Sequence, residues 1–172
     1  MTVFLNLDLN EIVYDIQNKT YLTGKSRHDG DNHEKVANMQ ANDDEENANQ
    51  VLRSVAMAFA NLKTRLGEYL DHTAVSTGNE LIDMNKDLKL SLVMPSNYNL
   101  STIDTLAEAA HQYVVSMAVA DWFTITNKGD AKEYSAMAES SLRIISEAAS
   151  KRSRPMRKWE ATENPEGKEA QP

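Results

Sequence analysis

Histidine offers the most versatile side-chain chemistry in this sequence, because imidazole can bind a metal ion or transfer a proton near neutral pH. The chain has four, His28, His33, His72 and His111. No two of them form an HExxH motif or a ligand pair along one helix. His28 and His33 lie in a polar stretch where contact with solvent is the ordinary outcome, and His111 lies beside an apolar helical face, where it would contact another helix. The histidines therefore predict no metal site.

Two acidic stretches approach the spacing of a calcium-binding loop. Residues 83–89 read DMNKDLK, which places the first three oxygen ligands, but Leu88 stands where the loop needs glycine and Met94 where it needs glutamate. HDGDNHEK at 28–35 lacks the later ligands. The chain also has no cysteine, six glycines, and no GxxxxGK[ST], GxGxxG or GxSxG motif. The sequence therefore predicts neither an enzyme nor a metal or cofactor site.

The strongest charge feature is a basic run near the C-terminus that contains one tryptophan. It allows three interpretations: contact with phosphates, the last turn of a helix followed by a tail, or docking on an acidic protein surface with the tryptophan as anchor. Arginine and aromatic residues together are typical of protein interfaces. We therefore expect the run to bind a partner protein through Lys151, Arg152, Arg154, Arg157 and Trp159.

Length and charge limit the class of protein. A chain of 172 residues can bury one sizeable core, and the excess of 26 acidic over 18 basic residues disfavours a duplex nucleic-acid binder as a whole. No window approaches roughly 18 consecutive apolar residues, so we expect no contact with a membrane. The N-terminus, MTVFLNLDLNE, lacks the basic region and cleavage site of a signal peptide, which predicts an intracellular origin.

The N-terminal residues alternate between apolar and polar side chains, apart from Phe4, and predict a short strand. No hairpin partner follows it, so the strand must pair with an edge in its own chain or in a neighbouring subunit. The residues predicted to bind a partner in this way are Val3, Leu5, Leu7 and Leu9. Asp8 or Asn10 would cap a short helix that ends at Gly24, and a polar linker would follow over 28–50.

Three longer helices are predicted after the linker. Apolar residues recur every three and four positions from about 44 to 71, and the segment 101–126 is apolar around so much of its circumference that we expect it at the centre. NKGD at 127–130 is a tight connection, so a helix over 130–152 should be its antiparallel neighbour. Alternation near 80–93 predicts a small β-hairpin that turns at Asn85–Lys86.

The predicted fold is therefore mainly α. It is an antiparallel helical bundle with a short N-terminal strand, a small β-hairpin near 80–93 and extended terminal arms. Residues 1–43 are expected to form an N-terminal arm and polar linker, residues 44–152 the helical bundle domain, and residues 153–172 a C-terminal tail.

A stretch from about 100 to 158 combines two packed helices with a basic end. Its motif residues are Ala109-Ala110, Tyr113-Val114-Val115, Trp122-Phe123, Asp130-Ala131, Tyr134 and Lys151-Arg152-Ser153-Arg154-Pro155. This pattern resembles small virion neck proteins of tailed bacteriophages, of the head–tail connector (adaptor) type, especially in phages of gut Bacteroidales.

The resemblance implies a structural protein that forms a homo-oligomeric ring, a dodecamer, between portal and tail. It implies the portal protein and other neck or tail proteins as partners, with DNA met only as it passes through the lumen. The protein would be located in the virion, and in the host cytoplasm during assembly. Two other functions fit the residues: a small helical regulatory or adaptor protein that binds a cellular partner through its 101–150 helices, and a nucleic-acid-associated protein that uses the basic segment 151–158.

Overall fold

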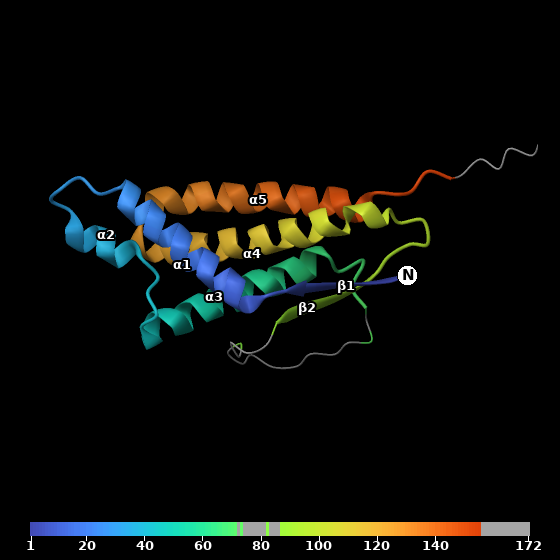
Figure 1. Ribbon diagram of the computed structural model, residues 1–172, viewed down its shortest axis with the longest axis horizontal. Helices are drawn as coiled ribbons and strands as arrows, with labels where there is room; N and C mark the ends of the chain where they lie inside the picture. The colour runs from blue at the N-terminus through green and yellow to red at the C-terminus, as the bar shows by residue number, and fades with distance from the viewer. Residues whose placement is uncertain (72, 74–81, 83–86, 156–172) are drawn as a thin grey trace, which may run out of the picture.

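The computed structural model describes residues 1–71, 73, 82 and 87–155 (Figure 1). The chain is mainly helical, as predicted, with a short two-stranded antiparallel sheet. In chain order, the elements are β1 (Thr2–Leu7), α1 (Leu9–Ser26), α2 (His33–Met39), α3 (Glu45–Arg65), β2 (Leu88–Val93), a 3-10 turn (Leu100–Thr102), α4 (Ile103–Thr126) and α5 (Lys128–Ser150).

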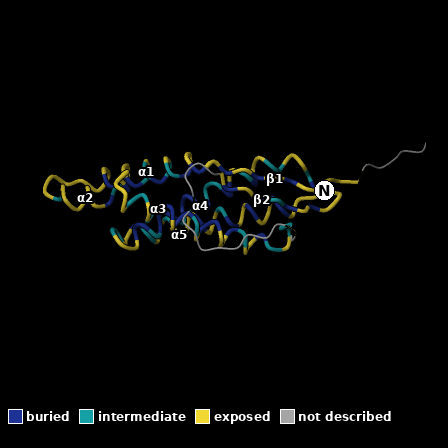
Figure 2. The backbone as a smooth tube through the Cα atoms, turned by 90° about the horizontal axis from the view of Figure 1, so that it is seen from below, coloured by how far each residue is buried: buried dark blue, intermediate teal, exposed yellow. Residues whose placement is uncertain are grey.

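α4 is the central helix, as the breadth of its apolar surface predicts. It packs against α5, α3 and α1, and twelve of its residues are buried. Ala109, Ala110 and Ala118 are among them, and their small side chains let neighbouring helices approach closely. One residue, Asn127, separates α4 from α5, so the two helices lie antiparallel (Figure 1). Figure 2 shows the buried positions running along the inside of the bundle and the exposed ones outside it.

The sheet covers one end of this bundle. β1 pairs with β2 so that Val3, Leu5 and Leu7 stand opposite Leu92, Leu90 and Leu88, and all six side chains are buried. The chain then turns directly into α1, because the Asp8 carboxylate accepts hydrogen bonds from the backbone N–H groups of Asn10 (2.8 Å) and Glu11 (3.4 Å).

The predicted N-terminal strand is confirmed, but its partner is in the same chain. The four apolar side chains expected to bind a partner are all in the core, so that prediction is wrong for Val3, Leu5, Leu7 and Leu9. The complementary strand lies far along the chain, and alternation alone could not identify it. β2 itself falls within the predicted hairpin, but it pairs with β1 instead, and Asn85–Lys86 lies outside the described residues.

Residues 1–43 do not form an extended arm and linker. Leu9, Ile12 and Ile16 of α1 and Met39 of α2 are fully buried against the bundle. Gly24 does not end α1, which continues to Ser26. A Cβ at Gly24 would lie only 3.2 Å from the Val36 carbonyl oxygen, so a larger residue there would press against the backbone of α2. Among the described residues, no helix is long and apolar enough to cross a membrane.

Candidate functional site

The predicted basic docking residues begin at the end of α5. Lys151 ends the helix, and its ammonium group pairs with the Glu147 carboxylate at 2.7 Å. The hydrogen bond from Lys151 lowers the pKa of Glu147 below its ordinary value. The Arg152 guanidinium donates to the Ala149 carbonyl at 3.0 Å, which suits a cation at a helix C-terminus. Arg154 follows in an exposed position, and Arg157 and Trp159 lie outside the described residues.

The start of this segment is fixed to the body of the protein. The Asn99 N–H donates to the Lys151 carbonyl at 3.2 Å, and the Ser153 N–H donates to the Asn97 carbonyl at 2.7 Å. Tyr98 and Arg152 form an isolated β-bridge between these two bonds. Beyond it the chain runs to Pro155 in an extended course that leaves the end of α5 and heads away from the bundle (Figure 1). We call residues 151–159 the basic segment.

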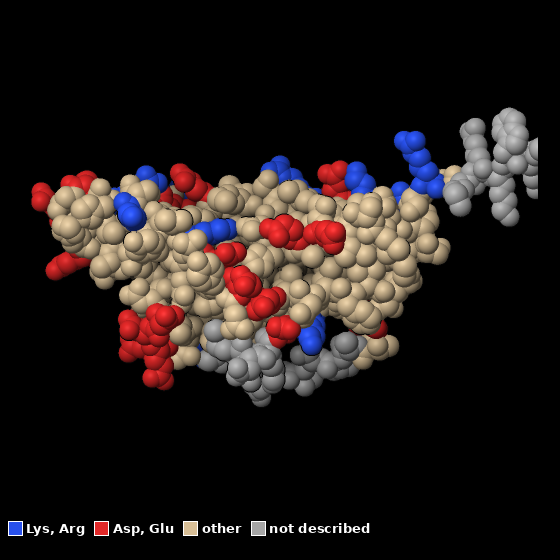
Figure 3. Space-filling model, viewed as in Figure 1, with Lys and Arg blue, Asp and Glu red and all other residues tan. Residues whose placement is uncertain are grey.

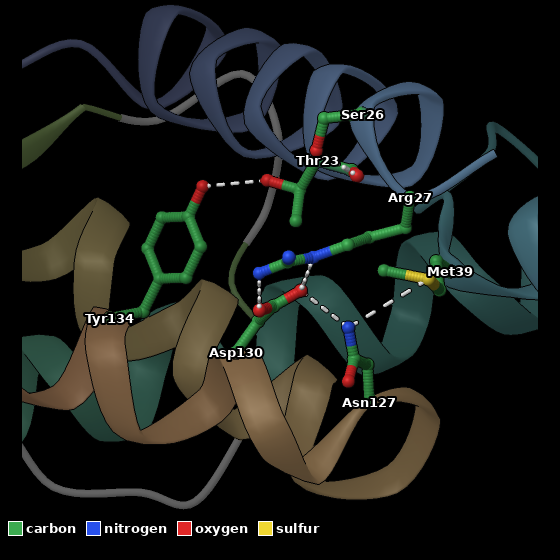
Figure 4. A network of polar contacts seen from close by, with 7 residues as sticks. All are labelled: Thr23, Ser26, Arg27, Met39, Asn127, Asp130 and Tyr134. Atoms are coloured by element: carbon green, nitrogen blue, oxygen red, sulfur yellow. Dashed lines mark hydrogen bonds and ion pairs between the residues drawn. The ribbon is translucent and has the colours of Figure 1, made fainter. Parts of the chain in front are cut away.

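A polar network lies at the opposite end of α5 (Figure 4). The carboxylate of Asp130, which is 4% exposed, accepts two hydrogen bonds from the Arg27 guanidinium, at 2.5 and 3.2 Å. The Asn127 amide donates to the same carboxylate at 2.5 Å. Nearby, the Thr23 and Tyr134 hydroxyls are 2.8 Å apart. The hydrogen bond with Asp130 raises the pKa of Arg27 above its ordinary value.

This network fastens the N-terminal helices to the turn between α4 and α5. Arg27 ends α1, and the Asn127 amide also lies 3.8 Å from the Met39 sulfur of α2. Both carboxylate oxygens of Asp130 accept hydrogen bonds, so this buried carboxylate joins the end of α1 to the α4–α5 turn. No local pattern predicts this ion pair, because Arg27 and Asp130 are 103 positions apart in the sequence.

A second polar surface lies between α1 and α4. It is a groove of about 460 Å³ that includes five carboxylates, Asp8, Glu11, Asp15, Asp104 and Glu108. We call it the acidic groove. In Figure 3, acidic side chains cross the middle of the visible face, over these two helices. His111 lies within the groove and its Nε2 is 2.9 Å from the Asp15 carboxylate, which confirms its predicted helix–helix contact.

One lysine borders the acidic groove. The Lys19 ammonium donates to the Gln112 side chain at 2.9 Å. Burial lowers the pKa of Lys19, while the nearby carboxylates of Asp15 and Glu108 oppose that shift. None of the described residues that line the groove is a lysine or arginine. The groove therefore presents a concentrated negative charge on a chain that already has a net charge of −8.

His28, in the loop after α1, lies beside His33, the first residue of α2. Their ring nitrogens, Nε2 and Nδ1, are 2.9 Å apart, and both residues are exposed. The sequence predicted solvent contact for each but not their proximity. Within the ranges that the structure describes, no three side chains of the kinds that bind metals gather in one place. The pair alone therefore does not make a metal site.

No protein-family model, no curated protein and no solved structure matches this chain. The charged surfaces of the molecule are therefore what indicates its function. The basic segment and the acidic groove are separate, and they have opposite charge. Surfaces of this kind recognise charged partners.

Proposed function

We propose that this chain is a structural virion protein of a tailed phage, which forms a ring in the neck between portal and tail. One observation carries the proposal: a helical subunit with two separate surfaces of opposite charge, one of them an extended segment that leaves the bundle. Subunits that bind head to tail through different surfaces form a ring when the rotation between neighbours closes after a whole number of copies. The resemblance of residues 100–158 to neck proteins supports the same function.

In this proposal the core has no chemical role. The helices hold the two surfaces in fixed positions, and the Arg27–Asp130 network keeps α1, which forms one wall of the acidic groove, against the bundle. The ring would contain twelve copies, as the resemblance implies, and it would contact the portal and other neck or tail proteins. The protein would be found in virions and, during assembly, in the host cytoplasm.

Co-expression with the portal protein of the same phage tests the proposal. The expected result is a co-purifying complex in which electron microscopy shows a ring of this chain against the portal. A chain that never binds the portal and is missing from purified virions would refute it. Retention on DNA that weakens steeply with salt, and that is lost when Arg152 and Arg154 are replaced by alanine, would instead favour the nucleic-acid function.

A further inference from the structure

The outer edge of β1 is free among the described residues. On the far side of β2, the Ser91 carbonyl accepts from the Asp71 N–H (3.0 Å), and the Val93 N–H donates to the Tyr69 carbonyl (2.6 Å). Backbone groups alternate in direction along a strand, so the even-numbered residues of β2 face β1. In this register, the backbone hydrogen bonds from β1 to β2 are made by Val3, Leu5 and Leu7. The N–H and C=O groups of Thr2, Phe4 and Asn6 therefore point outward, where no described strand pairs with them.

This edge lacks the features that usually prevent pairing with another chain. The strand TVFLNL has no charge, no proline and no bulge in its register. Phe4 is 76% exposed on the outer face of the sheet, and Val93 and Met1 are exposed beside that end of it. An uncharged strand edge with an exposed aromatic residue is a template for the addition of one more strand.

The acidic groove continues from the end of the same strand. Asn6 and Leu7 of β1 line it together with Asp8, so a strand added along β1 would run into the groove. Within the described part of the chain, the carboxylates of Glu11 and Asp104 make no hydrogen bond or ion pair. The added strand must therefore bring cations to this position, which excludes most segments of an acidic protein.

The basic segment has the required chemistry. It contains five cations and one tryptophan within residues 151–159. Lys151 and Arg152 contact the end of their own α5, so the cations from Arg154 onward are the ones that would meet another surface. Pro155 lacks an N–H, which is tolerated in a strand that forms the outer edge of a sheet. The residues after Trp159 include Glu160 and Glu163, which the groove would repel. This limits the interacting stretch to about the basic segment.

We propose that the outer edge of β1 and the acidic groove bind the basic segment of a neighbouring copy of this chain, which adds a third strand to the sheet. Residues 151–155 leave the end of α5 in a direction away from α1, which favours a neighbour over the same chain (Figure 1). The inference rests on the proposed function for the presence of several copies in one ring. It identifies the contact that joins them.

The absence of cysteine allows a direct test by disulfide cross-linking. One preparation of the full chain carries Asn6→Cys, and two others carry Met156→Cys or Lys158→Cys. Mixed and oxidised, the two kinds of chain should form a covalent dimer that contains one of each. A single chain that carries both cysteines should form covalent oligomers of increasing size. The control places the first cysteine at Ser140, an exposed position on α5, and should give only background dimer.

A second pair of variants tests the charges. Glu11→Lys with Glu108→Lys on the groove, or Arg154→Glu with Arg157→Glu on the basic segment, should each lower the dimer yield about fivefold, as expected for two exposed ion pairs. Mixing the groove variant with the basic-segment variant, so that both charges are reversed, should restore most of the dimer yield. Circular dichroism of each variant confirms that the helices are retained.

Three outcomes would overturn the inference: a dimer yield no higher than with the Ser140→Cys control, no effect of charge reversal, or only an internal disulfide in the doubly substituted chain. The last would place the basic segment on its own groove. If cross-linking fails while the chain still forms a ring on the portal, the inference is lost and the proposed function stands. If cross-linking succeeds and no portal complex forms, the contact between copies stands and the proposed function is lost.

Discussion

Neighbouring residues of β1 should differ sharply in their effect on stability. Leu5 is 2% exposed and stands opposite Leu90 in the core, whereas Phe4 is 76% exposed on the outer face of the sheet. Leu5→Ala removes three buried carbon atoms, each with about 0.8 kcal/mol of transfer free energy, or about 2.4 kcal/mol in all. The cavity that remains adds to this, so we expect the free energy of unfolding to fall by about 3 kcal/mol.

Phe4→Ala removes a larger side chain but exposes almost no new surface. The free energy of unfolding should change by no more than about 0.5 kcal/mol. The two variants lie on one strand and share its backbone pairing with β2, so the comparison isolates burial from strand formation. If the β1 edge is an interface between copies, Phe4→Ala should also reduce cross-linking through Asn6→Cys.

Urea unfolding followed by the change in tryptophan fluorescence, to which Trp122, buried in α4, contributes, measures the stability of both variants. For a domain of this size, the free energy of unfolding falls by about 2 kcal/mol per molar urea, so a loss of about 3 kcal/mol lowers the unfolding midpoint by about 1.5 M urea. Equal midpoints for Leu5→Ala and wild type would refute the placement of β1 in the core. A large loss in Phe4→Ala would refute its placement at the surface.

Three further predictions concern the ends of the helices. Asp130→Ala should lower the free energy of unfolding by about 1–3 kcal/mol, because the charge-assisted hydrogen bonds in Figure 4 are lost. Glu133 is exposed, so Glu133→Ala should change the free energy of unfolding little, and thermal melting compares the two variants. The hydrogen bond from Lys151 lowers the pKa of Glu147, so this pair stabilises the fold at pH values above the ordinary pKa of glutamate. The stabilisation is lost as the pH falls through the lowered pKa. An NMR titration of the Glu147 carboxyl group should show a higher pKa in Lys151→Ala than in the wild type. Gly24→Val should loosen α2, so amide hydrogen exchange over His33–Met39 should be faster in the variant than in the wild type, while exchange in α4 should stay unchanged. Equal exchange rates over His33–Met39 in the two proteins would contradict the close approach of α2 to Gly24.

The elements with a local signal were predictable from the sequence. α3 has apolar residues every three and four positions, with Glu45 and Glu46 in its first turn and Lys63 and Arg65 in its last, which suit the helix dipole. The breadth of apolar surface placed α4 at the centre. Each of these predictions depends on residues within one element.

Features that join distant positions were not predictable. The pairing of β1 with β2, the contact of Gly24 with Val36 and the ion pair between Arg27 and Asp130 all depend on which elements pack together. Alternation identified β1 as a strand with one apolar face but could not show which partner it pairs with. The acidic groove was missed for the same reason, because its carboxylates come from α1 and α4 and from the residue before α1.

The pairing of the first strand with a much later one has a consequence for synthesis. β1 is made first, but β2 begins only at Leu88 and α4 only at Ile103. At about 5–20 residues per second, roughly 4–16 seconds separate the synthesis of β1 from that of β2. During that interval the apolar sides of β1 and α1 emerge without β2 and α4, so the nascent chain exposes part of its future core until its second half has been translated.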